Sequence, residues 1–192
     1  MAYLSLSNEP AAEESRRSFL KKSGLVLSGT AIALLAGQDA LAKSGSKSGE
    51  ADLSVLNSAL GAEYEAIAAY QVGAESGLLQ KPVLDLAVMF QGQHKEHAEL
   101  LSKTVTKLGG KAVEAKDKYH FPTDTLKNQN DVLRFAAGLE QGAVSAYLGA
   151  VPLFHNRDLA KAAASILGDE AMHLAILRNA LGETPVPSAF MS

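Results

Sequence analysis

Apolar side chains recur at alternating spacings of three and four residues over four long stretches of the chain. This spacing places them on one face of an amphipathic α-helix. The pattern predicts four helices, at residues 51–75, 82–108, 131–151 and 157–181. Each helix would be about 30–40 Å long. The stripe expected on the second helix comprises Leu84, Val88, Leu101, Val105 and Leu108.

The ends of the predicted helices carry capping signals. Lys81-Pro82 opens the second helix with a proline in its first turn, and Gly109-Gly110 closes it. The Asn/Asp-rich segment 128–131 precedes the third helix, and a turn at His155-Asn156 precedes the fourth. These signals support the helix boundaries.

The connections between the helices differ in length. Those within the first and second pairs are short, so each pair is predicted to be an antiparallel hairpin. The connection at 109–130 is unusually long unless it spans something. We expect it to run the length of the bundle and to return the third helix to the end where the first began. The chain is therefore predicted to be all-α, a four-helix bundle made of two hairpins joined by a long crossover.

The amino-acid composition limits the kinds of site that the chain can form. Hydrophobic residues make up 47% of the chain and aromatic residues only 6%, which favours helices packed through small side chains. A net charge of −3 argues against a nucleic-acid surface or a polybasic membrane anchor. The absence of cysteine excludes disulfides, thiolate metal sites and iron–sulfur clusters. Any transition metal must therefore be held by His, Asp or Glu.

The N-terminal segment resembles a twin-arginine export signal. Ser15-Arg16-Arg17-Ser18-Phe19-Leu20-Lys21 precedes an apolar run, 24–37, which is shorter than the ~20 residues of a membrane span. Ala40-Leu41-Ala42 then forms a small-x-small cleavage site. We expect the twin-arginine machinery to deliver the protein to the periplasm or the exterior, cleaved after Ala42 and without a stable membrane anchor. The predicted division is 1–42 signal peptide, 43–50 flexible mature N-terminus, 51–182 bundle and 183–192 C-terminal tail.

Six ionisable residues interrupt the apolar stripes near the middle of the helices. They are Glu63, His94, His97, Glu140, Glu170 and His173. Their positions predict that all six point into the core. A buried, unpaired carboxylate costs several kcal/mol or more, and no lysine or arginine occupies the stripes at this level. A pair of divalent metal ions would supply the missing positive charge.

The two halves of the chain repeat this pattern. Glu63 precedes Tyr70 by the same seven residues that separate Glu140 from Tyr147. The second and fourth helices share internal spacings over the sets Gly92, His94, His97, Leu101 and Gly168, Glu170, His173, Leu177. A hairpin duplicated in tandem would produce this repeat and a pseudo-twofold axis. Tyr70 and Tyr147 are expected to fill the core with a hydroxyl partner, to hydrogen-bond a metal ligand, or to act as a radical relay.

The spacing Glu-x-x-His places two side chains one helical turn apart on one face. The carboxylate can then bridge two metals while the imidazole binds one, and a glutamate from each remaining helix completes the site. This is the ligand plan of the di-iron and di-manganese carboxylate bundles. Over residues 52–181 the chain resembles the ferritin-like superfamily, in particular its small exported domain proteins, and more distantly rubrerythrin.

The resemblance implies a role for each candidate ligand. Glu63 and Glu140 would be terminal carboxylates, Glu170 a bridging carboxylate, and His97 and His173 terminal imidazoles. Two divalent ions are expected, with iron first and manganese or zinc as alternatives.

Position 94 departs from the family pattern, which has glutamate where this chain has histidine. A histidine that binds one metal through one nitrogen is a poor bridge, and the ligands would carry three negative charges rather than four. The site could then hold one metal, two different metals, or a pair bridged by Glu170 and solvent. Glu96 and Glu99 lie roughly 160–200° around the helix from the histidines and are poor substitutes.

Two other histidines and the tail carry weaker signals. His120 is expected in the crossover, packed on the bundle, and His155 in the turn before the fourth helix. The segment 183–192, with two prolines, would be extended and lie over the bundle or against a second subunit. A homodimer is compatible with such a bundle.

These features favour redox chemistry outside the cytoplasm: Fe(II) oxidation, or reduction of O₂ or H₂O₂. Without cysteine there is no rubredoxin-type module, so electrons would come from Fe(II) or an external donor. The alternative is a non-catalytic periplasmic metal-binding or stress-protection protein whose metal is structural, which position 94 favours. A metal-free bundle that binds proteins through its surface is a third, weaker hypothesis, and no feature indicates a mineral-storage cage.

Overall fold

The computed structural model describes residues 48–191, so the predicted signal peptide lies outside the described residues. These residues form four long helices, α4 (Ser48–Glu75), α5 (Lys81–Lys107), α6 (Gln129–Ala150) and α7 (Arg157–Ala180). Two short 3₁₀ turns, η1 (Thr123–Thr125) and η2 (Val151–Leu153), lie in the connections, and the described range holds no strand. The predicted all-α four-helix bundle is confirmed.

The observed helices follow the predicted ones closely. The largest difference is at the first, where α4 begins at Ser48 rather than at Ala51. The last residues of the segment predicted to be flexible, 48–50, are therefore helical. Asn128 caps α6 by accepting a hydrogen bond from the Asp131 amide at 3.1 Å, and Asn156 caps α7 in the same way. Gly109, with a φ of 81°, follows the end of α5.

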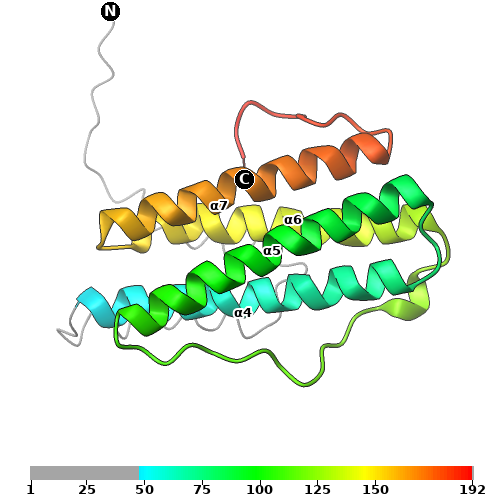
Figure 1. Cartoon of the computed structure of the whole chain (residues 1–192). Helices are drawn as coiled ribbons and strands as arrows, with labels where there is room; N and C mark the ends of the chain where they lie inside the picture. Colours follow the sequence, from blue (N-terminus) through cyan, green and yellow to red (C-terminus); the bar gives the residue numbers. More distant parts are fainter. Residues whose placement is uncertain (1–47, 192) are drawn as a thin grey trace, which may run out of the picture.

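Two antiparallel hairpins, α4–α5 and α6–α7, lie side by side, and the crossover between them runs the length of the bundle (Figure 1). Asn57 of α4 fixes the crossover by donating to the Lys111 carbonyl and accepting from the Val113 amide. Farther along the crossover, Phe121 packs against Phe135, while the neighbouring His120 is exposed rather than packed on the bundle as expected.

The direction of α6 differs from the prediction. Tyr70 contacts Glu140 while Tyr147 contacts Glu63, so α6 runs antiparallel to α4. The third helix thus begins at the end where the first stops. A crossover that spans the bundle leaves from the end of α5, which lies beside the start of α4, and must deliver α6 to the opposite end.

The buried face of α5 also differs from the predicted stripe. Val88 is 53% exposed and Leu108 is 45% exposed. The buried positions are Phe90, Gln91, His94, Ala98, Leu101 and Val105. Gln91 precedes His94 by three residues, and the others are spaced by three or four, so all lie on one face. Val88 precedes His94 by six residues, which places it roughly 240° around the helix.

Two apolar clusters divide the core along the bundle axis. The first comprises Leu56, Leu60, Ala98, Leu101, Val105, Tyr147, Ala163 and Ile166. The second comprises Tyr70, Phe90, Leu133, Ala136 and Leu177. On every helix the candidate ligands fall between the residues of one cluster and those of the other. A polar layer therefore lies between two apolar ones.

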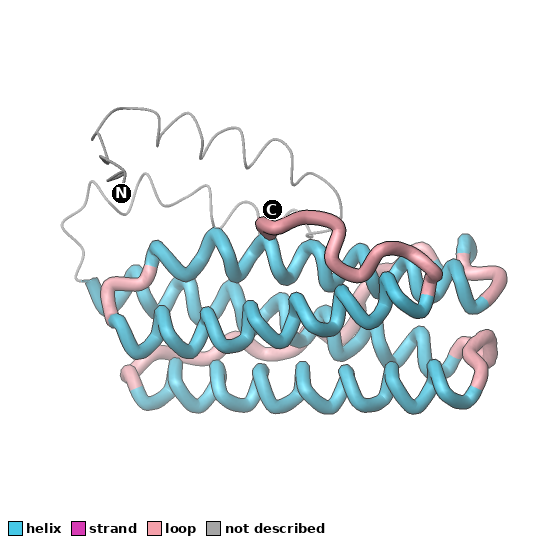
Figure 2. The backbone as a smooth tube through the Cα atoms, turned by 90° about the horizontal axis from the view of Figure 1, so that it is seen from above, coloured by secondary structure: helices cyan, strands magenta, loops and turns pink. Residues whose placement is uncertain are grey.

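After α7 the chain turns back along the bundle in both views (Figures 1 and 2). The side chains of residues 182–191 are exposed. No helix within residues 48–191 is long and apolar enough to cross a membrane.

Candidate metal centre

The structure brings all six candidate ligands together in the polar layer. Five are almost inaccessible to solvent, with exposures of 2% or less: Glu63, His94, Glu140, Glu170 and His173. The side chain of His97 is 14% exposed. All four long helices contribute, and an apolar cluster lies on either side of the layer along the bundle axis.

The ligand atoms form two overlapping groups, and within each group they all lie within 4.8 Å of one another. The first group consists of Glu63, His94, His97 and Glu170. The second consists of His94, Glu140, Glu170 and His173. Either group could hold one metal ion, and His94 and Glu170 belong to both.

Four buried atoms in this layer have no hydrogen-bond partner among the described residues. They are His97 Nδ1, His173 Nδ1 and both carboxylate oxygens of Glu170. The Glu170 oxygens divide between the histidines, with Oε1 3.1 Å from His97 Nδ1 and Oε2 3.4 Å from His173 Nδ1. Unpaired buried polar atoms are costly, and these atoms are all metal-ligand types. The residues present therefore fit a pair of metal ions.

The outer nitrogens of two histidines are held by residues outside the candidate set. His173 Nε2 donates a hydrogen bond to Gln93 Oε1 at 2.7 Å, and His97 Nε2 lies 3.3 Å from Asp169 Oδ2. These oxygens can accept a hydrogen bond from Nε2–H, and Nδ1 of each ring then faces the centre. Once Nδ1 has lost its proton, this is the tautomer that a metal ligand requires.

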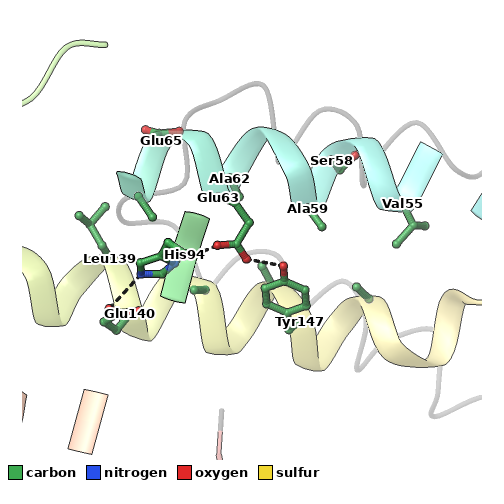
Figure 3. A pocket seen from close by; sticks show the side chains of 14 residues that line it. Val55, Ser58, Ala59, Ala62, Glu63, Glu65, His94, Leu139, Glu140 and Tyr147 are labelled. Carbon is green, nitrogen blue, oxygen red and sulfur yellow. Dashed lines mark hydrogen bonds and ion pairs between the residues drawn. The ribbon is translucent and has the colours of Figure 1, made fainter. Parts of the chain in front are cut away.

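Each tyrosine pairs with a glutamate across the bundle, and Figure 3 shows the pair formed by Tyr147 and Glu63. The Tyr147 hydroxyl donates to Glu63 Oε1 at 2.5 Å, and the Tyr70 hydroxyl donates to Glu140 Oε1. Each tyrosine thus contacts the glutamate of the other repeat, which is the relation expected of a pseudo-twofold axis. One oxygen of Glu63 is fixed by this bond, while Oε2 faces the first metal group.

In the metal-free layer, the histidines and the glutamates shift one another's pKa values. Burial acts to lower the histidine pKa values, but hydrogen bonds with the facing glutamates outweigh it. They raise the pKa of His94 to about 11, of His97 to about 10 and of His173 to about 9. Without metal, protons on the histidines balance the carboxylates.

The three glutamates respond differently to their surroundings. Burial acts to raise the pKa of Glu63 and of Glu140, but hydrogen bonds from the histidines outweigh it and the pKa of each is lowered. Burial raises the pKa of Glu170 above its ordinary value despite contacts with two histidines. Glu170 is therefore the carboxylate that depends most on a cation that the chain does not provide.

A cavity of about 70 Å³ lies between α4 and α6 and reaches this layer (Figure 3). Its inner end is formed by Glu63, His94 and Glu140. The walls consist largely of alanines, namely Ala59, Ala62, Ala66, Ala143, Ala146 and Ala150. Most of these alanines are partly exposed, so the cavity approaches solvent.

A family model of the ferritin-like domain matches residues 51–183. The chain belongs to the ferritin-like domain family. The crystal structure of a conserved hypothetical protein, rv2844, from Mycobacterium tuberculosis matches with a TM-score of 0.65 at 24% sequence identity. That match covers 75% of this chain and 99% of the other, and it supports the fold alone. No curated protein matches the chain.

Within this ferritin-like domain, position 94 is where the resemblance implied glutamate and the chain has histidine. His94 lies at the centre of the layer, with Nδ1 2.8 Å from Glu63 Oε2 and Nε2 3.3 Å from Glu140 Oε1. Glu96 and Glu99 are exposed, so neither replaces the missing carboxylate. His94 is therefore the residue that, with Glu170, belongs to both candidate metal groups.

Sequence reasoning missed Gln93 and Asp169 in the ferritin-like domain. Each immediately precedes a residue of the repeated motif, His94 and Glu170 respectively, so the repeat contains a signal for them. Both side chains are only half-buried, and hydropathy alone does not distinguish such positions from a solvated face.

Replacing Tyr147 with phenylalanine should weaken metal binding by about 10–100-fold, because Glu63 loses the donor that orients it. The ring remains to fill the first apolar cluster, so the fold should persist. Isothermal titration calorimetry with Zn²⁺ measures the change. Tyr119→Phe, in the crossover, is the matched control and should leave the affinity unchanged. Equal affinities for Tyr147→Phe and wild type would contradict this role.

Proposed function

We propose that this ferritin-like protein binds two divalent transition-metal ions, with iron expected, and uses them for redox chemistry. The reaction would be oxidation of Fe(II) or reduction of H₂O₂ or O₂. The observation that carries the proposal is the set of four unpartnered buried atoms, which come from both hairpins and converge on one space. In a metal-free bundle these unpartnered buried atoms would lower the stability of the fold without any compensating interaction.

The residues of the layer would have different roles in binding the metal ions. Bound iron would supply two electrons per pair, which with two protons reduce one H₂O₂ to two waters. Glu63, Glu140 and Glu170 would hold the positive charge, and His97 and His173 would bind through the nitrogens that Asp169 and Gln93 leave free. The apolar clusters keep bulk water from the site.

The cavity between α4 and α6 supports a small reactant. Its volume of about 70 Å³ and its alanine walls suit O₂ or H₂O₂ better than a bulky organic substrate. It ends at Glu63 of the first metal group, at Glu140 of the second, and at His94, which belongs to both. A molecule that enters there would meet the metal positions directly.

The test is oxygen and peroxide consumption by purified mature protein loaded anaerobically with Fe(II). We expect stoichiometric consumption by the wild type and a loss of more than about 100-fold in Glu63→Gln, since a direct ligand should matter more than an outer partner. Full-rate consumption by Glu63→Gln, at equal iron content, would sink the proposal.

Ala143→Leu provides a variant that leaves every candidate ligand in place. It narrows the cavity wall one turn from Glu140, so it should slow the reaction severalfold while the iron content stays at two per chain. Ala164→Leu, at an exposed position of α7, is the control and should react at the wild-type rate. Equal rates for the two variants would show that the reactant enters elsewhere.

A second candidate is a metal-binding or stress-protection protein in which the metal is structural. It is favoured by His94, whose contacts with Glu63 and Glu140 balance two carboxylates without any metal. Protein isolated from its native compartment with zinc, and inert after exchange of zinc for iron, would support this candidate over redox chemistry.

The export signal supports a site of action in the periplasm or outside the cell. The twin-arginine route carries folded proteins, which suits a metal inserted before export. Replacing Arg16 and Arg17 with lysine should retain the full-length protein in the cytoplasm, as measured by cell fractionation and immunoblotting. Arg157→Lys, in the folded domain, should be exported normally. Export of the double variant at the wild-type level would contradict the assignment.

A further inference from the structure

The two metal groups share one carboxylate whose oxygens face different sides. Glu170 Oε1 lies 3.1 Å from His97 Nδ1 in the first group, and Glu170 Oε2 lies 3.4 Å from His173 Nδ1 in the second. Neither oxygen has a hydrogen-bond partner among the described residues. Glu170 therefore has the geometry of a bridge between two metal positions.

The two nitrogens of His94 also face different metal groups. Nδ1 faces the first group, 2.8 Å from Glu63 Oε2 and 3.6 Å from Glu170 Oε1. Nε2 faces the second group, 3.3 Å from Glu140 Oε1. The ring is 1% exposed, and its position between Glu63 and Glu140 leaves neither nitrogen directed to solvent. An imidazole can bind a metal through either nitrogen.

We infer that His94 bridges the two metal positions as an imidazolate, with Nδ1 on one ion and Nε2 on the other. The inference rests on the proposed metal binding and adds to it the bridging ligand. It differs from the arrangements that the sequence left open, because the two ions are joined by Glu170 and by the ring of His94 rather than by Glu170 and solvent. The ring passes one proton to solvent as the second bond forms, so the ring carries one negative charge.

The charge of the site supports this arrangement. A neutral His94 would leave three negative charges, those of Glu63, Glu140 and Glu170. An imidazolate adds a fourth, the number that a glutamate at position 94 would provide. Two bound cations favour the deprotonated form of a ligand, as they do for coordinated water and thiols.

The experiment is a crystal structure of the protein loaded with Zn²⁺ alone, with anomalous data on both sides of the zinc absorption edge. We expect two zinc ions, each at a bond length of about 2.0–2.1 Å from a different nitrogen of His94. Their separation should exceed the ~3.5–4 Å of oxygen-bridged metal pairs. His94→Glu should shorten the separation into that range, while His155→Gln, at an exposed position, should not change it.

Copper provides an independent readout in solution. Loading with Cu²⁺ alone should give an electron paramagnetic resonance spectrum weakened by coupling of the two ions through the ring. His94→Gln should lose that coupling, and His155→Gln should retain it. The zinc structure of the wild type decides the question even if His94→Gln does not fold.

The outcomes separate this inference from the function on which it rests. Zinc bound by one nitrogen of His94, with the other nitrogen still paired to Glu63 or Glu140, would overturn the bridge and leave metal binding intact. A single zinc ion per chain would overturn the bridge and the two-ion stoichiometry, while leaving metal binding at this site intact. Absence of zinc from the site would overturn the proposed function as well.

Discussion

Glu170→Gln should abolish stable metal binding at both positions. Glu170 is the carboxylate whose two oxygens are divided between the two groups, and neither oxygen has another partner among the described residues. An amide offers one neutral oxygen in place of two charged ones. Mutation of a residue that only orients a ligand lowers metal affinity by about 10–100-fold. Replacing a ligand shared by both positions should therefore lower the affinity by more than about 100-fold.

The variant should nevertheless fold. Burial raises the pKa of Glu170 in the metal-free layer, so its carboxyl group tends toward the neutral form there. Glutamine has nearly the same shape and is also neutral, and the helices on either side keep their apolar contacts. Loss of metal in a folded protein would therefore identify a ligand rather than a structural residue.

Metal content after dialysis, with circular dichroism to confirm the fold, measures the effect. Glu96→Gln is the matched control, because Glu96 is exposed on α5 only two residues from His94. It should retain two ions per chain. Two ions in folded Glu170→Gln would contradict the assignment of Glu170 as a ligand shared by the two metal positions.

Periodicity predicted the helices and the level of the site because both depend on local spacing. Glu170 and His173 are one turn apart on a face that also carries Ile166 and Leu177, so their burial follows from helix geometry alone. The same reasoning failed for Val88, where the polar His94 and Gln91 are buried and the apolar residue is not. In a polar layer, hydropathy no longer identifies the buried face.

The remaining features depend on how the hairpins meet, which no local pattern determines. The pairing of Tyr70 with Glu140 follows from the antiparallel arrangement of α4 and α6, and thus from the path of the crossover. The contact between Gln93 and His173 joins the two hairpins. The two-sided position of His94 likewise appears only when both glutamates are placed around it.

The unpartnered atoms of the layer also determine what metal should do to stability. In the metal-free protein, His97 Nδ1, His173 Nδ1 and the two oxygens of Glu170 are buried without hydrogen-bond partners among the described residues, which lowers the stability of the fold. The unfolded chain has no such preformed site. Metal that binds the folded state alone therefore stabilises it by mass action, by about 4 kcal/mol when its free concentration is a thousandfold above Kd.

Removing the metal should consequently lower the melting temperature substantially. A domain of this size changes its Tm by about 2–4 °C per kcal/mol, so the metal-loaded protein should melt roughly 8–16 °C above the protein stripped with a chelator. Scanning calorimetry of the two forms measures the difference. Glu170→Gln should melt at one temperature with or without metal, whereas Glu96→Gln should show the full shift. If the Tm of the wild type were the same with and without metal, the protonated histidines alone would balance the buried carboxylates. The carboxylates would then not form a metal site.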